Sequence, residues 1–197
     1  MDAQQRARLL DVDDSVLCVV DVQPGFVGKI ATHDRAPFAQ RVVWVAALAD
    51  ALGVPIVVTE EEPDHNGLTL PEIVARLPDP TPRYIKPTFG LADVPEIMRA
   101  VEATGRRTAV LVGMETDVCV AHSALGLLDR DYRVVAVRDA VLSPGEAHDD
   151  GIERMRAAGV TLMNAKALFY EWTRTIDVAR KLDAVMASVP VPDGFTL

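Results

Sequence analysis

The sequence TAVLVGMETDVCV, residues 108–120, joins a short apolar run to a segment that holds two carboxylates and a cysteine. A nearly continuous apolar run, as at residues 108–113, is typical of a strand buried on both faces of a parallel sheet. Similar runs occur four more times along the chain, at residues 16–20, 54–59, 133–137 and 160–163. The five runs therefore predict a mainly parallel sheet.

The segments between these runs have the spacing of helices. Apolar residues recur every three or four positions within residues 38–52 and 97–104. Gly53, Gly105 and Gly159 each stand just before an apolar run and after a helical segment, where a helix commonly ends. Strands that alternate with helices predict an α/β fold, here a doubly wound three-layer α/β/α sandwich.

We expect a single domain over residues 1–197, with its core at about residues 15–177. Seven prolines within residues 63–95 leave no room for a long helix, so this segment should cover one end of the sheet. Residues 171–197 are predicted to form a last helix, up to residue 188, and then an extended arm that could pack on a neighbouring chain.

The charge of the chain excludes some classes of partner. It has 20 basic and 29 acidic residues, a net charge of −9 and a pI near 4.9, which disfavours nucleic acid and anionic membrane surfaces. The longest apolar run, residues 42–49, is far shorter than the roughly 18–20 residues that span a bilayer. We therefore expect no membrane segment and a cytoplasmic location. Two cysteines, Cys18 and Cys119, are too few for a disulfide framework.

Three polar side chains stand at the ends of predicted strands. Asp21 follows the run at residues 16–20, Lys86 follows a very short β-like segment, and Cys119 opens the helix after the run at residues 108–113. Ligands of open α/β sheets bind outside the carboxyl ends of the strands. We expect the carboxylate, the ammonium and the thiol to converge at this edge.

Such a trio suits nucleophilic catalysis. A free thiol has a pKa of roughly 8.5, and both a helix N-terminus and a nearby lysine favour the thiolate. Asp21 would pair with Lys86, accept the thiol proton and return it to a leaving amine, while backbone N–H groups around residues 115–119 would form an oxyanion hole. Each residue alone is commonplace, and Cys18, inside an apolar run, is expected to be inert core.

Three motifs make the chain resemble the isochorismatase-like cysteine hydrolase superfamily, over about residues 15–177. They are DVQPGF at residues 21–26, Lys86 ahead of Phe89, and GMETDVCV at residues 113–120, in the order in which the superfamily has them. The third motif is the most specific.

The resemblance implies a Rossmann-type α/β/α sandwich with a catalytic triad of Asp21, Lys86 and Cys119. In members of this superfamily a non-proline cis peptide bond precedes the cysteine, here between Met114 and Glu115. The backbone N–H groups of Glu115 and Cys119 then form the oxyanion hole. The resemblance also implies a homo-oligomer, a dimer or larger.

The metal site of nicotinamidases has an aspartate and two histidines after the second strand, whereas the segment TEEEPDHNG at residues 59–67 has only one histidine. We interpret it as a solvated acidic loop and expect no metal, no other cofactor and no nicotinamidase activity. Isochorismatases proper cleave a vinyl ether and generally lack the cysteine, so Cys119 favours hydrolysis of a small amide or carbamoyl C–N bond. We expect Phe26 and Phe89 to line the pocket of a small-molecule substrate, and Glu115 to bind a substrate amine or face solvent.

Two alternatives stay open. In an isochorismatase-type ether hydrolase, Asp21 would act as the acid and Cys119 would be a bystander. In a catalytically silent oligomeric binding protein of the same fold, none of the three residues would have a chemical role. The intact trio argues against this second alternative.

Overall fold

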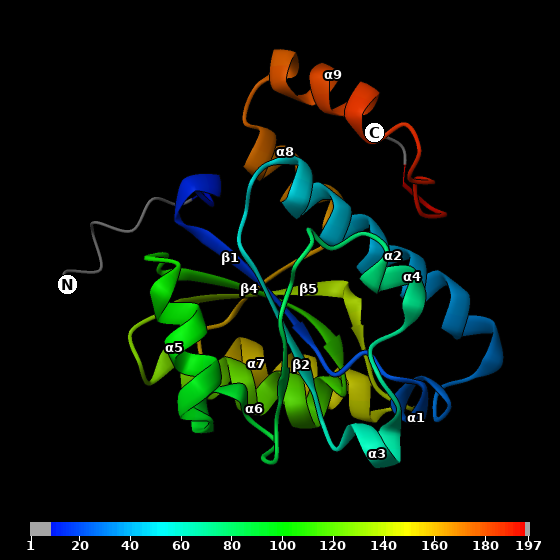
Figure 1. Cartoon of the computed structure of the whole chain (residues 1–197), viewed down its shortest axis with the longest axis vertical. Helices are drawn as coiled ribbons and strands as arrows, with labels where there is room; N and C mark the ends of the chain where they lie inside the picture. Colours follow the sequence, from blue (N-terminus) through cyan, green and yellow to red (C-terminus); the bar gives the residue numbers. More distant parts are fainter. Residues whose placement is uncertain (1–8, 196–197) are drawn as a thin grey trace.

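The described residues, 9–195 of this computed structural model, form a six-stranded parallel sheet in the order β3-β2-β1-β4-β5-β6 (Figure 1). The strands are β1 (Ser15–Val20), β2 (Ile56–Glu60), β3 (Arg83–Ile85), β4 (Thr108–Met114), β5 (Arg133–Leu142) and β6 (Thr161–Met163). The predicted parallel sheet is confirmed. Each of the five apolar runs overlaps a strand, and β3 is the short segment before Lys86.

Helices cover both faces of this sheet, as predicted (Figure 1). One face carries α2 (Thr32–Ala51) and α8 (Ala165–Thr173), and the other carries α5 (Pro95–Ala103), α6 (Ala121–Leu128) and α7 (Ala147–Ala157). In β1, Leu17 and Val19 pack in the core layer of α2, whereas Val16, Cys18 and Val20 pack in the layer of α6. A central strand of this sandwich is therefore apolar at successive positions, because both of its faces are buried.

Short helical elements lie in the segments that lead into or out of the strands. They are the helices α1 (Pro24–Val27), α3 (Pro63–Asn66) and α4 (Pro71–Val74), the 3₁₀ turns η1 (Val12–Asp14) and η2 (Leu91–Asp93), and the π-helical turn η3 (Thr116–Val120). Specifically, α1 follows β1, α3 follows β2 and η3 follows β4. Within residues 9–195, no helix has the length and apolar character needed to span a bilayer.

The C-terminal segment is not the single helix predicted up to residue 188. A break at Arg174 and Thr175 separates α8 from α9 (Ile176–Val185). Arg174 has a φ of 59°, and the side chain of Thr175 accepts a hydrogen bond from the N–H of Val178. The chain therefore changes direction and starts a newly capped helix.

The end of the predicted arm folds back on its own chain. Val189 is buried, and the ring of Phe195 packs edge-on against Trp44 of α2, with ring centroids 5.4 Å apart. Residues 1–8 of the predicted domain and residues 196–197 of the predicted arm lie outside the described residues.

Two glycines allow close backbone approaches beside the cysteine motif. Gly113 in β4 has a φ of 127°, and a Cβ atom there would lie 2.0 Å from the carbonyl oxygen of Val20. Gly151 in α7 is similarly placed, because its Cβ would lie 2.6 Å from the backbone nitrogen of Asp117. These contacts bring the end of β4 against β1, and η3, which carries Cys119, against α7.

We predict that Gly113→Ala lowers the free energy of unfolding by about 3 kcal/mol or more, because the methyl group meets backbone and the φ is unfavourable. Gly53→Ala is the control, since Gly53 has a φ of 67° but no atom within 4 Å of its Cβ position. It should cost roughly 1–2 kcal/mol. Urea unfolding followed by tryptophan fluorescence measures both, and equal losses would contradict the steric explanation.

Candidate active site

The three residues predicted to converge lie together at the carboxyl edge of the sheet. Asp21 directly follows β1, Lys86 directly follows β3, and Cys119 lies in η3. The Oδ2 atom of Asp21 is 3.0 Å from the Nζ atom of Lys86, and both side chains are fully buried. The Sγ atom of Cys119, itself buried, lies within 4.8 Å of an Asp21 carboxylate oxygen.

The carboxylate of Asp21 is hydrogen-bonded at one oxygen and ion-paired at the other. Its Oδ1 atom accepts a hydrogen bond of 2.7 Å from Thr59 Oγ1 in β2, and its Oδ2 atom faces Lys86. Asp21 also has a φ of 49°, a conformation that residues other than glycine seldom adopt. Burial raises the pKa of Asp21, and the Lys86 ammonium and the Thr59 hydroxyl offset only part of this rise. The carboxylate is therefore costly to bury and depends on these partners.

The ammonium of Lys86 has three oxygen partners. These are the carboxylate of Asp21, the carboxylate of Glu61 at 3.0 Å and the backbone carbonyl of Thr88. Burial lowers the pKa of Lys86, but the neighbouring Asp21, Cys119 and Glu61 together raise it by more, so the net shift is upward. Lys86 therefore keeps its positive charge at neutral pH.

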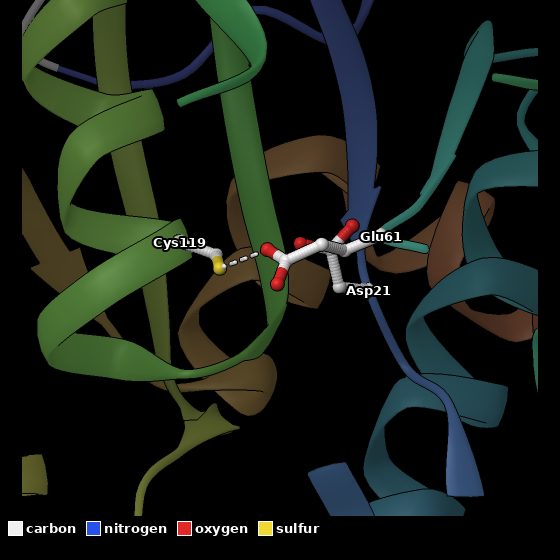
Figure 2. A group of neighbouring side chains, drawn as sticks. All are labelled: Asp21, Glu61 and Cys119. Carbon is white, nitrogen blue, oxygen red and sulfur yellow. Dashed lines mark hydrogen bonds between the residues drawn. The ribbon is translucent and has the colours of Figure 1, made fainter. Parts of the chain in front are cut away.

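The acidic segment after β2 is solvated only in part, which corrects the prediction of a solvated loop: Glu62, Asp64 and His65 are exposed, but Glu60 and Glu61 turn inward. The Oε2 atom of Glu61 accepts a hydrogen bond from Lys86 Nζ at 3.0 Å. It accepts a second from Cys119 Sγ at 3.2 Å (Figure 2). Glu60 is buried and hydrogen-bonded elsewhere, and of the three glutamates only Glu62 is exposed.

The backbone of Glu61 is also fixed. Gln23, which is fully buried, accepts a hydrogen bond from the Glu61 N–H at 2.8 Å and donates one to its carbonyl at 3.0 Å. Asn66 donates a third, at 2.9 Å, to the same carbonyl. The sequence analysis missed Glu61, although it directly follows β2 just as Asp21 directly follows β1. That position after a buried strand is the signal that could have identified it.

The surroundings of Cys119 favour the neutral thiol, whereas the two influences identified from the sequence, Lys86 and a helix N-terminus, favour the thiolate. Burial raises the pKa of Cys119, the Asp21 and Glu61 carboxylates raise it further, and the Lys86 ammonium lowers it only in part. The lysine acts as predicted, but burial and two carboxylates outweigh it. The other thiol, Cys18, is fully buried, and burial raises its pKa to about 12.

The backbone before Cys119 makes a tight turn. The peptide bond between Met114 and Glu115 is cis, at the position that the resemblance implied. The Oε1 atom of Glu115 lies 3.2 Å from Lys29 Nζ, so this carboxylate is paired and mostly buried instead of facing solvent. Thr116 Oγ1 lies 3.0 Å from His148 Nδ1, a contact that ties η3 to α7.

The two rings predicted to line a pocket lie in different environments. Phe26 is 4% exposed and belongs to the core, with the Lys29 ammonium 4.5 Å from its ring centroid. Phe89 is 57% exposed and packs edge-on against His122, with centroids 5.9 Å apart. Of the two rings, Phe89 is the one open to contact from outside.

The side chains of Asp21, Glu61 and Cys119 are close enough together to be considered as ligands for a cation, since one possible ligand atom of each lies within 4.8 Å of the others. However, the Lys86 ammonium already lies 3.0 Å from an oxygen of both carboxylates. A divalent ion would therefore have to share this space with a buried positive charge. We do not identify these residues as metal ligands.

A doubly wound parallel sheet with a thiol, an ammonium and two carboxylates at its carboxyl edge defines an isochorismatase-like α/β protein. Residues 15–167 match the isochorismatase domain, and the chain belongs to this family of hydrolases. The predicted family and fold are thus confirmed.

The chain is similar to several known proteins. It is 30% identical to the probable hydrolase YcaC of Escherichia coli over 175 residues, which are 85% of this chain and 84% of YcaC. The structure of that protein, described as an octameric hydrolase of unknown specificity, superposes with a TM-score of 0.79 at 25% identity and covers 94% of this chain and all of YcaC.

Two further solved structures are similar over nearly their whole length. YcaC from Pseudomonas aeruginosa, solved with hexane-2,5-diol and covalent acrylamide, has a TM-score of 0.81 at 26% identity, covering 92% of this chain and 98% of that one. The MAR1 ribonuclease from Caenorhabditis elegans has a TM-score of 0.83 at 25% identity, covering 96% of this chain and 98% of that one.

We predict that Lys86→Met lowers the free energy of unfolding by roughly 3–5 kcal/mol at pH 8, because two buried carboxylates lose their cation. The loss should shrink towards pH 5. The pKa of Asp21 in the folded protein is already raised, and it should rise further without Lys86. As the pH falls, the folded variant therefore binds a proton before the unfolded chain does, which stabilises the folded variant and reduces its loss of stability.

Urea unfolding at pH 5 and pH 8 tests this prediction. Lys29→Met is the control, because the Lys29 side chain is 48% exposed, so its ion pair with Glu115 is open to solvent on one side. It should cost less than about 1 kcal/mol. A loss in Lys86→Met that does not depend on pH would contradict the electrostatic explanation.

Proposed function

We propose that this protein hydrolyses a small amide- or carbamoyl-type C–N bond through an acyl-enzyme on Cys119, with Asp21 and Lys86 as the other members of a triad. The observation that carries the proposal is the hydrogen bond between the Cys119 thiol and a carboxylate of the buried cluster around Lys86. A thiol beside a proton acceptor, at the edge of the sheet where ligands bind, is the arrangement that nucleophilic catalysis requires.

The reaction proceeds in two halves. The thiol proton passes to the carboxylate cluster as Sγ bonds to the substrate carbonyl carbon, and the carbonyl electron pair moves to oxygen, where backbone N–H groups of Glu115 and Cys119 stabilise it. The C–N bond then breaks, and the leaving nitrogen takes the proton. Water attacks the resulting thioester, the acid leaves, and Sγ regains a proton. Lys86 keeps the cluster charged and in place throughout.

The charge of the site supports a neutral amide over a chorismate-type ether. Asp21 and Glu61 carry two negative charges, and the one ammonium between them, Lys86, is already bonded to both and to a carbonyl. A substrate with carboxylates of its own would be repelled by this excess. The net charge of −9 likewise disfavours the phosphodiester backbone of RNA, despite the likeness to a ribonuclease.

A related protein supports the chemistry of the site. The Pseudomonas aeruginosa YcaC structure contains covalent acrylamide, a small amide that reacts with nucleophiles such as thiols. By analogy, Cys119 would be the residue of this chain that reacts with electrophilic amides.

We predict that Cys119→Ala lowers turnover by a factor on the order of 10³ or more, because no other group in the triad can form the acyl-enzyme. The assay is release of ammonia or amine from a panel of small amides, N-carbamoyl compounds and hydrazides. Cys18→Ala, which removes a thiol from the core, is the matched control and should keep its activity. If Cys119→Ala stays active on a vinyl ether while Asp21→Asn does not, the ether-hydrolase alternative replaces this proposal.

We also propose a homo-oligomer, by analogy with the octameric Escherichia coli YcaC. Ile85 and Phe89, on either side of Lys86, are 63% and 57% exposed, and apolar surface of this kind is often covered in an assembly. Sedimentation equilibrium should give a mass that is a multiple of 21.3 kDa, and a purely monomeric species would contradict the proposal.

A further inference from the structure

Glu61 is the charged residue of the site that a triad of Asp21, Lys86 and Cys119 does not include. Its Oε2 atom contacts both the thiol, at 3.2 Å, and the ammonium, at 3.0 Å. Figure 2 shows the sulfur of Cys119 turned towards this carboxylate. We propose that Glu61, and not Asp21, takes the proton of the Cys119 thiol during attack, which makes Glu61 a fourth catalytic residue. The inference rests on the proposed role of Cys119 as the nucleophile.

Asp21 is poorly placed to take this proton. Its two oxygens already face Thr59 and Lys86, and its side chain has no exposed surface. The hydrogen bond of the thiol runs to Glu61 instead. A proton on Asp21 would also neutralise the carboxylate that forms the fully buried ion pair with Lys86.

Glu61 can take the proton without disrupting the site. When Glu61 is neutral, Lys86 still pairs with Asp21, so a compensated ion pair remains in the core. The Oε1 atom of Glu61 has no hydrogen bond among the described residues, and its side chain is 16% exposed, so it can approach a substrate. Gln23 holds the Glu61 backbone on two sides, which keeps the carboxylate beside the thiol.

The proton transfer balances in both directions. Sγ gives its proton to Glu61 Oε2 as it bonds to the carbonyl carbon, whose electron pair moves to oxygen. When the intermediate collapses, the C–N bond breaks and the nitrogen takes the proton from Glu61, which becomes a carboxylate again. Glu61 thus serves first as base and then as acid.

Among the described residues, three titratable side chains face Glu61 from neighbouring elements. They are Asp21 after β1, Lys86 after β3 and Cys119 in η3. Lys86 keeps its charge, and Asp21 is tied to Lys86. Glu61 is therefore the carboxylate in contact with the thiol that can accept its proton, and a transfer within this pair takes no proton from solvent and gives none to it.

Alkylation of Cys119 by iodoacetamide tests this proton transfer without a substrate. Sγ bonds to the carbon, iodide leaves with the bonding pair, and the thiol proton goes to Glu61. In the wild-type protein the rate should vary by less than about twofold between pH 6 and pH 8. In Glu61→Gln only solvent can remove the proton, so the rate should rise about tenfold per pH unit. Peptide mass mapping confirms that the label is on Cys119.

Glu62→Gln is the matched control, because it makes the same change at the exposed neighbouring glutamate, and it should keep the flat profile. On an amide that the wild-type protein hydrolyses, Glu61→Gln should lose at least about 100-fold in kcat while its alkylation at pH 8 is no slower than in the wild type. A lower kcat with an unchanged alkylation rate would distinguish a catalytic carboxylate from a structural one, because a distorted site would slow both reactions.

A wild-type alkylation profile that rises in parallel with that of Glu61→Gln overturns the inference, because the proton then leaves without Glu61. Full amide turnover in Glu61→Gln also overturns the inference. Failure of the proposed function is a different result. If alkylation shows the flat profile but Cys119→Ala keeps full turnover, Glu61 still accepts the thiol proton and the acyl-enzyme proposal is the part that fails.

Discussion

The buried ammonium of Lys86 is the charge on which the arrangement of this site depends. It is fully buried, and each of its oxygen partners comes from the end of a different strand: Asp21 after β1, Glu61 after β2 and Thr88 after β3. A cation without water must be compensated by protein oxygens, so these loops cannot move apart without exposing an unpaired charge. One side chain thus holds three adjacent strand ends in a single geometry.

The chemistry of the thiol follows from the same cluster. Two carboxylates surround one ammonium, and this excess of negative charge, together with burial, keeps Cys119 protonated. Under the proposed mechanism, the nucleophile would therefore form during the reaction, by transfer of a proton to a group already in contact with the sulfur. The negative excess also disfavours anionic ligands, which agrees with the proposal that the substrate is a neutral amide or carbamoyl compound.

Much of the site could be predicted because polar residues directly follow the predicted strands. Asp21 follows an apolar run, Lys86 follows a very short β-like segment and Cys119 lies in the motif after β4, and the resemblance to a known family then linked the three. Glu61 was missed because a run of three glutamates is typical of a solvent-exposed loop. In the folded chain, Gln23 binds the Glu61 backbone and Lys86 binds its carboxylate, whereas Glu62 turns outward with a φ of 40°. The break at Arg174 was missed for a similar reason, since nothing in the local composition excludes a helix there.

From its sequence alone, this chain could be assigned a parallel sheet with a helical layer on each face and the edge at which its polar residues gather. These properties follow from local patterns, because burial on both faces requires a continuous apolar run and a helix requires its own apolar spacing. Only the tertiary structure decided which glutamate enters the site, which partner the thiol contacts and whether that thiol is charged. These depend on distances between segments that are far apart in the chain, such as the 3.2 Å between Cys119 and Glu61, and on burial that no single segment determines.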